Sequence, residues 1–240
     1  MNNNGSVNKT NMLVSDYDQT FYLSDDDIEA NKNSVERFRN EGNIFVIATG
    51  RSYFDFKNKL DLYNFAYDYV ILNHGATVLD KDDNIIVNYS IDNNIINNIK
   101  EDLRIAKTIR QFNCSGLESR VDFDYKNLTK IHAKYNSREE AMAINELINN
   151  KYSNYVTSYY VNTNSVEIIS NKTNKSIAIN NLIDKLNILK DNVYTIGDSY
   201  SDIDMIKDFK GYAMKESVNE LKQVAIKEYD SVSNLINDLM

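Results

Sequence analysis

Short hydrophobic runs alternate with longer segments of mixed polarity in the first third of the chain. The runs are Met12–Ser15, Ile44–Ala48 and Tyr69–Leu72. Short runs without regular polar alternation are typical of strands that are buried on both faces of a parallel sheet. The intervening segments predict one helix that follows Ser24–Asp27 and continues through Arg39, and a second that ends near Leu62. We therefore expect strands and helices to alternate, as in an α/β domain.

The pattern changes near Val78 and stays different as far as Ser170. Thr77–Asp80 and Ile85–Tyr89 flank a polar segment and predict an antiparallel hairpin. The sequence Ser137-Arg-Glu-Glu140 predicts the start of a helix, because a serine and a glutamate at this spacing form a capping box. The other elements expected here are a helix at Asp92–Lys107 and strands at Lys130–Tyr135, Tyr155–Val161 and Ser165–Ile169, with none assigned to Gln111–Thr129. This mixture predicts an α+β domain.

The alternation of helices and strands returns after Ser170. It predicts a helix at Lys175–Leu186, a strand at Val193–Ile196 and a helix from Asp202. The expected fold class is therefore α/β, with a Rossmann-like parallel-sheet core formed by residues 1–76 and 171–240. An α+β domain of residues 77–170 is inserted into this core.

The composition is that of an ordinary soluble globular protein, with 42% hydrophobic and 26% charged residues. No hydrophobic run reaches the roughly 18 residues of a membrane span, and the Asn-rich start lacks the features of a secretory signal. We therefore expect a cytoplasmic protein with no membrane partner. The net charge of −8 and the lack of a basic stripe argue against a nucleic-acid partner. A small anionic substrate is still compatible, because a metal ion and a few local cations can outweigh the overall charge.

Cys114 is the only cysteine, so the chain can form neither an intrachain disulfide nor a cysteine metal site. As a nucleophile it would need a neighbouring base, and the two histidines, His74 and His132, show no recognisable triad pattern. The alternative is a buried or half-buried thiol, and the sequence favours it.

Two acidic turns follow predicted strands of the core. Asp16 and Asp18 come directly after the first strand, while Asp198 and Asp202 follow a later one. Ligands of open parallel sheets bind at the carboxyl ends of the strands, where one or two carboxylates can hold Mg²⁺. Adjacent carboxylates also repel each other, which suits one as an ionised nucleophile or metal ligand and the other as an acid or base. The alternatives are a solvated acidic turn for the first pair and a helix cap for Asp202.

Two further groups could bind an anion. Thr49, Gly50 and Arg51 follow another predicted strand and offer a hydroxyl, a flexible backbone and the start of a helix. Lys175 lies near the start of a later helix, where its charge could offset two carboxylates and a phosphoryl group. By itself, a lysine in such a polar segment is more typical of a surface residue.

Taken in order, these residues resemble the four motifs of the haloacid dehalogenase superfamily, specifically of its Cof-type phosphatases with an inserted cap. The motifs are matched by Asp16–Thr20, Thr49–Arg51, Lys175–Ala178 and Gly197–Met205. Further points of similarity are His74–Ala76, Glu167–Ile168 and Ala213–Met214. The resemblance therefore covers nearly the whole chain.

The resemblance implies a role for each matching residue. Asp16 would form an aspartyl-phosphate, and Asp18 would protonate the leaving group and then activate water. Thr49 and Lys175 would hold the phosphoryl oxygens, and further phosphate or substrate contacts would come from Gly50, Arg51, His74 and Ser201. Magnesium would be held by Asp16, the backbone carbonyl of Asp18, Asp198 and Asp202, the last of which would orient the metal's ligand shell. The cap would exclude water and select the substrate.

The chain departs from the family pattern at several positions. Gln19 replaces the usual glycine, which predicts a different loop conformation or a side chain that points away. His74 and Ser201 each stand where asparagine is usual, and Lys215–Glu216 stands where Gly-Asn is usual. No departure removes a catalytic carboxylate or the lysine, although His74 could equally be a structural histidine.

The resemblance favours hydrolysis of a small phosphorylated metabolite, with a sugar phosphate as the expected class. A sugar phosphomutase of the same superfamily is compatible with the same motifs. So is a sensor that binds a metabolite phosphate and keeps the metal site without turnover. We expect a monomer or a homodimer.

Overall fold

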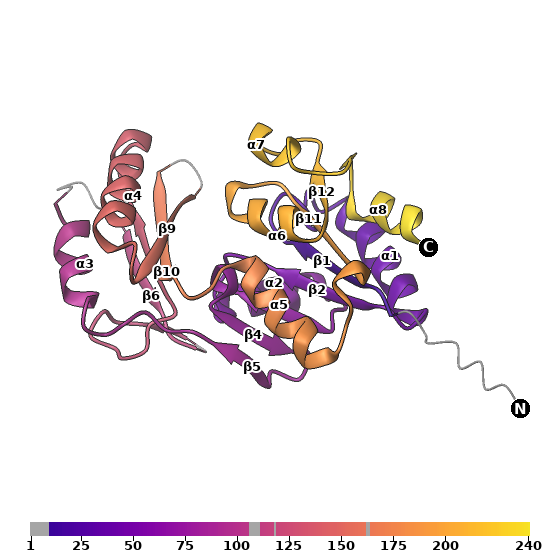
Figure 1. The fold of residues 1–240 in the computed structure, drawn as a ribbon, viewed down its shortest axis with the longest axis horizontal. Helices are drawn as coiled ribbons and strands as arrows, with labels where there is room; N and C mark the ends of the chain where they lie inside the picture. The colour runs from indigo at the N-terminus through magenta and orange to yellow at the C-terminus, as the bar shows by residue number, and fades with distance from the viewer. Residues whose placement is uncertain (1–9, 106–110, 118, 162–163) are drawn as a thin grey trace, which may run out of the picture. The chain divides into compact units, whose positions relative to one another are not determined.

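Two compact parts make up the chain in the computed structural model, which describes residues 10–105, 111–117, 119–161 and 164–240 (Figure 1). The first part comprises residues up to Ile47, residues 66–69 and residues 182–240. The second comprises residues 48–65 and 70–181. No helix among the described residues combines the length and the hydrophobicity that crossing a membrane requires.

A largely parallel sheet forms the centre of the first part, with the strand order β13-β12-β11-β1-β2. Its strands are β1 Met12–Asp16, β2 Ile44–Ala48, β11 Val193–Gly197, β12 Lys210–Met214 and β13 Glu228–Tyr229. β1 runs parallel to β11, with Val14 opposite Thr195 and Ser15 opposite Ile196. Every residue of β1 is buried, as the hydrophobic run at its start predicts for a strand inside the sheet.

The helices of the first part are α1 Ile28–Asn40, α6 Ile203–Asp208, α7 Asn219–Lys222 and α8 Val232–Leu239, with 3-10 turns η2 Lys190–Asn192 and η3 Tyr200–Asp202. α1 and α8 lie side by side (Figure 1), and the hydroxyl oxygens of Ser34 and Ser233 are 2.7 Å apart. α1 buries Val35 and Phe38, whose three-residue spacing puts both side chains on one face of the helix.

The second part begins with α2 Tyr53–Tyr63 and the strands β3 Tyr69–Leu72, β4 Thr77–Asp80 and β5 Ile85–Asn88, which are hydrogen-bonded in that order. A 3-10 turn, η1 Asn73–Gly75, follows β3, and α5 Lys175–Leu186 starts in this part. β4 and β5 form the predicted antiparallel hairpin, with Thr77 opposite Asn88 and a bulge between Val78 and Leu79. The insertion boundaries expected at residues 77 and 170 stay a prediction.

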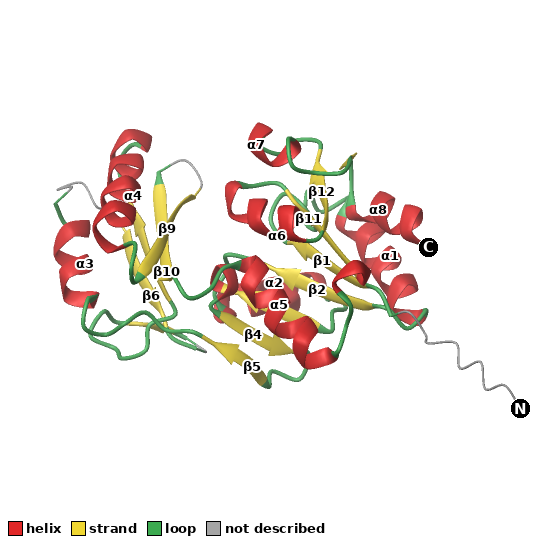
Figure 2. Cartoon of the chain, viewed as in Figure 1, coloured by secondary structure: helices red, strands yellow, loops and turns green. Residues whose placement is uncertain are grey.

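A five-stranded antiparallel sheet forms the rest of the second part, in the order β7-β6-β8-β10-β9. Its strands are β6 Gln111–Ser115, β7 Arg120–Val121, β8 Lys130–Lys134, β9 Val156–Val161 and β10 Ser165–Ser170. The helices α3 Ile96–Leu103 and α4 Arg138–Tyr152 lie on one face of this sheet (Figure 2). They share one hydrophobic core with it, in which Ile99 and Ile148 pack with Ile131 and Val166.

The expected α/β class is confirmed, and most predicted elements are present with similar bounds. α3 is shorter than predicted, because Asp92 accepts a hydrogen bond from the N–H of Asn94 at 2.9 Å and forms a turn before the helix begins at Ile96. The helix ends at Leu103, and the last two residues of the predicted helix, 106 and 107, lie outside the described residues. Strands β6 and β7 occupy the segment to which no element was assigned.

Candidate active site

The first acidic loop follows β1 in the first part. Asp16 ends the strand and is 6% exposed, whereas Asp18 is half-buried. The N–H of Phe21 donates to the carbonyl of Asp16 at 3.1 Å, and the N–H of Gln19 donates to the carbonyl of Tyr22 at 2.9 Å. These two bonds close the chain into a tight loop directly after β1.

Gln19 has φ at +61°, in the left-handed region that favours glycine. Its side chain is exposed, as expected for a side chain that points away. The backbone is left-handed at this residue, which costs an L-residue other than glycine about 1–2 kcal/mol. The loop therefore keeps its glycine-like backbone at an energetic cost.

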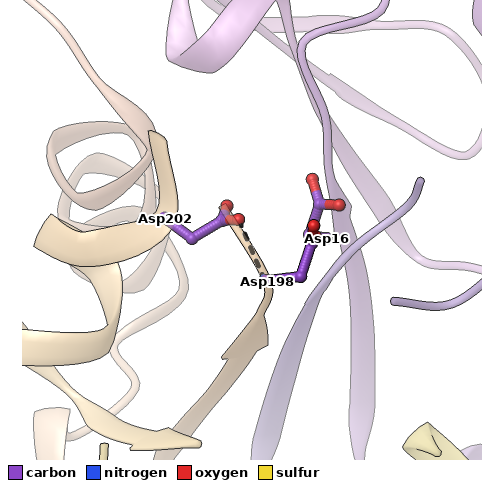
Figure 3. Close-up of side chains that lie close together, drawn as sticks. All are labelled: Asp16, Asp198 and Asp202. Carbon is purple, nitrogen blue, oxygen red and sulfur yellow. Dashed lines mark hydrogen bonds between the residues drawn. The ribbon is translucent and has the colours of Figure 1, made fainter. Parts of the chain in front are cut away.

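The second acidic loop follows β11 and is organised around Asp202. Oδ2 of this fully buried residue accepts a hydrogen bond from the N–H of Asp198 at 3.2 Å (Figure 3). It also accepts from the N–H of Ser199 at 3.0 Å and from the Ser199 hydroxyl at 2.8 Å. The hydroxyl oxygens of Ser199 and Ser201 are 3.0 Å apart. Asp202 thus caps the turn η3, to which it belongs. All three of these hydrogen bonds end on Oδ2, and none of them ends on Oδ1.

Gly197 allows Asp202 to approach this closely. A Cβ atom at Gly197 would lie 2.6 Å from Cγ of Asp202, which is too short for any real contact. A glycine at the end of β11 is therefore required for the buried carboxylate to lie against the strand.

The two loops bring together one carboxylate oxygen each from Asp16, Asp198 and Asp202, all within 4.8 Å of one another (Figure 3). Their proximity follows from the pairing of β1 with β11, which places the ends of both strands at the same edge of the sheet. Three carboxylates this close together can hold a metal ion, and hard carboxylate oxygens are the donors that Mg²⁺ prefers. The carboxylate of Asp18 does not belong to this group of described side chains.

Thr20 supports the same group from the first loop. Its hydroxyl, on a fully buried side chain, donates to Oδ1 of Asp198 at 3.0 Å. The sequence places Thr20 inside the first motif but offers no indication of this contact, because the two residues are 178 positions apart. Side chains that orient metal ligands in this way commonly tune metal affinity.

The loop Thr49–Arg51 lies in the second part, between β2 and α2. Thr49 is 1% exposed, and its Oγ1 accepts a hydrogen bond from the N–H of Arg51 at 3.1 Å. Ser52 then begins α2 as its N-cap, with its hydroxyl accepting from the N–H of Asp55. The expected order of a hydroxyl, a glycine and a helix N-terminus is therefore present, and the hydroxyl residue is buried.

Lys175 is buried, with 1% exposure, and is the first residue of α5. The preceding residue, Asn174, accepts from the N–H of Ile177 at 2.8 Å and so caps the helix. The hydroxyl of Thr173 donates to the carbonyl of Gly75 at 2.9 Å, which ties this segment to η1. The surface position that is typical of an isolated lysine is therefore excluded.

His74 lies in η1 with φ at +56° and is almost fully buried. Its Nε2 is 2.5 Å from Oε2 of Glu167, and its ring packs on Tyr159 with 4.8 Å between the ring centroids. Burial lowers the pKa of His74, and this effect outweighs the opposing effect of Glu167. The ring is therefore uncharged at neutral pH, and its hydrogen bond to the Glu167 carboxylate requires the proton to be on Nε2.

Glu167 contacts two further donors, Nζ of Lys130 at 2.7 Å and Nδ1 of His132 at 3.2 Å. Burial alone would raise its pKa, but the charge of Lys130 and the hydrogen bonds from both histidines hold that pKa well below the usual range. Glu167 is therefore ionised at neutral pH. The sequence indicated Glu167 only as a point of family similarity and did not indicate Lys130 at all.

Comparison with known proteins identifies the family. The haloacid dehalogenase-like hydrolases match residues 13–121 and 111–234, and the chain belongs to this family. A protein of Buchnera aphidicola subsp. Baizongia pistaciae, named as a candidate phosphatase, is 22% identical, and the match covers 95% of this chain and 97% of that protein. An uncharacterised protein of Mycoplasma capricolum is 27% identical over 88% of this chain and 93% of its own length.

Solved structures show the same fold. A haloacid dehalogenase-like hydrolase from B. subtilis has a TM-score of 0.83 at 17% identity, with 96% of this chain and 100% of that chain covered. A Bacteroides thetaiotaomicron protein described among the phosphatases of the superfamily has a TM-score of 0.78 at 19% identity, with 100% and 97% covered. The expected family and its hydrolase class are thereby confirmed.

Proposed function

We propose that the protein is a magnesium-dependent phosphatase that hydrolyses a small phosphorylated metabolite in the cytoplasm, with a sugar phosphate as the expected class. The single observation that carries the proposal is the group of three carboxylates from Asp16, Asp198 and Asp202, which can hold a metal ion through oxygens of the kind that Mg²⁺ prefers. Membership of the hydrolase family and the phosphatase names of a relative and of a structural neighbour support it.

Asp16 is the proposed nucleophile. One of its carboxylate oxygens attacks phosphorus, the bond between phosphorus and the leaving oxygen breaks, and Asp18 gives that oxygen a proton. Asp18 then takes a proton from water, whose oxygen attacks the aspartyl-phosphate and releases phosphate together with the Asp16 carboxylate. Bound magnesium would neutralise the phosphoryl charge and would be held by Asp16, Asp198, Asp202 and the backbone carbonyl of Asp18.

The residues of the second part are proposed to hold the phosphoryl group and the substrate. Thr49 would donate its hydroxyl proton and Lys175 its charge to the phosphoryl oxygens, with Gly50 and Arg51 beside them. His74 is a proposed substrate contact here, and Ser201 of the first part is another. The five-stranded domain would act as the cap that excludes water and selects the substrate.

A screen of sugar, nucleotide and cofactor monophosphates with and without Mg²⁺ tests the proposal, with Asp16→Asn as the decisive variant. We expect Asp16→Asn to lose at least about a thousandfold in the rate of phosphate release, because the nucleophile is lost. Asp26→Asn, which changes an exposed aspartate outside the site, is the matched control and should keep full activity.

Three results would overturn parts of this proposal. Full magnesium-dependent activity of Asp16→Asn would exclude Asp16 as the nucleophile. An isomeric sugar phosphate in place of free phosphate would identify a mutase. Magnesium binding without turnover across the whole panel would favour a sensor.

A further inference from the structure

The loop Thr49–Arg51 is held through three consecutive carbonyl groups. The carbonyl of Thr49 accepts from the N–H of His74 at 3.0 Å, and the carbonyl of Arg51 accepts from the N–H of Asn73 at 2.9 Å. The carbonyl between them, that of Gly50, accepts from Nζ of Lys130 at 2.5 Å. The two outer carbonyls are thus bound by neighbouring backbone, and the central one is bound by a charged side chain from β8.

The peptide that joins Gly50 to Arg51 is fixed from both sides. Lys130 binds its carbonyl, and its N–H donates to Oγ1 of Thr49 at 3.1 Å. A hydroxyl that accepts one hydrogen bond keeps its own proton for donation to another group. The orientation of this peptide therefore helps to decide where the Thr49 hydroxyl can donate.

Glu167 in turn fixes Lys130. Their charged groups are 2.7 Å apart, and the side chains of Lys130 and Glu167 are only 6% and 12% exposed. Buried charges of this kind depend on each other, because water cannot replace a lost partner. Glu167 also binds Nε2 of His74, whose ring lies so close to Gly50 that a Cβ atom there would be 2.5 Å from it.

We infer that Lys130 and Glu167 are positioning residues for phosphate binding: Lys130 orients the Gly50–Arg51 peptide, and Glu167 holds Lys130 in place. This inference rests on the proposed function, since it takes Thr49–Arg51 to contact the phosphoryl group. Both residues belong to the five-stranded sheet, so this domain orients the phosphate-binding loop in addition to its proposed role in substrate selection.

The test compares Lys130→Met with the wild type. Methionine keeps most of the side-chain volume but removes the charge and the donor. We expect KM for an aryl phosphate and Ki for inorganic phosphate to rise about ten- to a hundredfold, as the loss of a charged hydrogen bond predicts. The Mg²⁺ concentration for half-maximal activity should stay within about twofold, because other residues form the acidic group. Lys134→Met is the matched control, since it changes an exposed lysine on the same strand.

Two more variants separate positioning from mere structural support. Lys130→Arg keeps the charge and the donors and should recover part of the phosphate affinity. Glu167→Gln keeps the shape of the side chain but removes its charge, and it should also raise Ki for inorganic phosphate. This variant provides the test if Lys130→Met does not fold. An unchanged Ki in either folded variant, even with a lower free energy of unfolding, would overturn the inference. A wild-type protein that neither binds phosphate nor turns over any phosphomonoester would overturn the proposed function instead.

Discussion

The hydroxyl of Thr20 lies 3.0 Å from Oδ1 of Asp198 and donates a hydrogen bond to it. This bond joins the acidic loop after β1 to the acidic loop after β11 and restricts the rotation of the Asp198 carboxylate. Asp202 is restricted in the same way by three donors of its own loop. These hydrogen bonds therefore hold two of the three carboxylates of the acidic group in place.

Thr20→Val should weaken magnesium binding. The substitution removes the hydroxyl that orients Asp198, and the loss of such outer contacts typically costs about ten- to a hundredfold in metal affinity or activity. The measurement is the Mg²⁺ concentration at half-maximal phosphate release, together with direct titration of the metal. Thr20→Ser keeps the hydroxyl and should behave like the wild type. Equal magnesium affinity in Thr20→Val and the wild type would show that the bond does not orient the ligand.

Gln19→Gly should stabilise the protein. Gln19 has φ at +61° and an exposed side chain, so glycine would relieve backbone strain without losing packing. After the greater chain entropy of unfolded glycine is subtracted, we expect a gain of about 0.5–1 kcal/mol in the free energy of unfolding.

Urea denaturation of Gln19→Gly checks this expectation. The control is Gln223→Gly, because Gln223 is also exposed but has φ at −63°. Glycine should destabilise that position by a few tenths of a kcal/mol. If both variants lost stability equally, strain at Gln19 would not be the cause.

The acidic group could be predicted from the sequence, because Asp16 and Asp198 each follow a hydrophobic run that forms a strand, and parallel strands end at one edge. The pairing of Lys130 with Glu167 could not, since it depends on the antiparallel register of β8 and β10, which sets Glu167 opposite His132. The only signal in the sequence was the family similarity at Glu167–Ile168. β6 was not predicted, because its sequence is largely polar. It forms a strand through its antiparallel pairing with β8, which the sequence does not reveal.

The protein should lose stability as the pH falls below about 6.5. Burial lowers the pKa of His74, so the unfolded chain takes up a proton near pH 6.5 that the native state does not bind until a lower pH. Glu167 adds a second loss below about pH 4.3, because its native pKa is held well below that of the unfolded chain. Both groups bind more protons in the unfolded state, so acid favours unfolding.

His74→Asn measures how much of the loss of stability at acid pH comes from His74. Asparagine cannot titrate, so the decline that starts near pH 6.5 should become shallower, while the decline below about pH 4.3 should remain. Urea denaturation at several pH values between about 7.5 and 3 measures both slopes. If the His74→Asn curve ran parallel to the wild-type curve throughout, His74 would not be the titrating group.

Alkaline pH should destabilise the protein through Cys114. This residue is 2% exposed in the core of the five-stranded domain, and burial raises the pKa of its thiol to about 12. The unfolded thiol ionises near pH 8.5, so between about pH 8.5 and 12 the native state keeps a proton that the unfolded state has lost. The free energy of unfolding should then fall by about 1.4 kcal/mol per pH unit from this group. Cys114→Ala should remove that slope and leave the contribution of Tyr135, whose pKa burial also raises.

In the native wild type, the Cys114 thiol should react with an aromatic disulfide reagent only as fast as the domain opens. Rapid reaction of the folded protein at pH 8 would show an accessible thiolate and would reopen the possibility of a cysteine nucleophile.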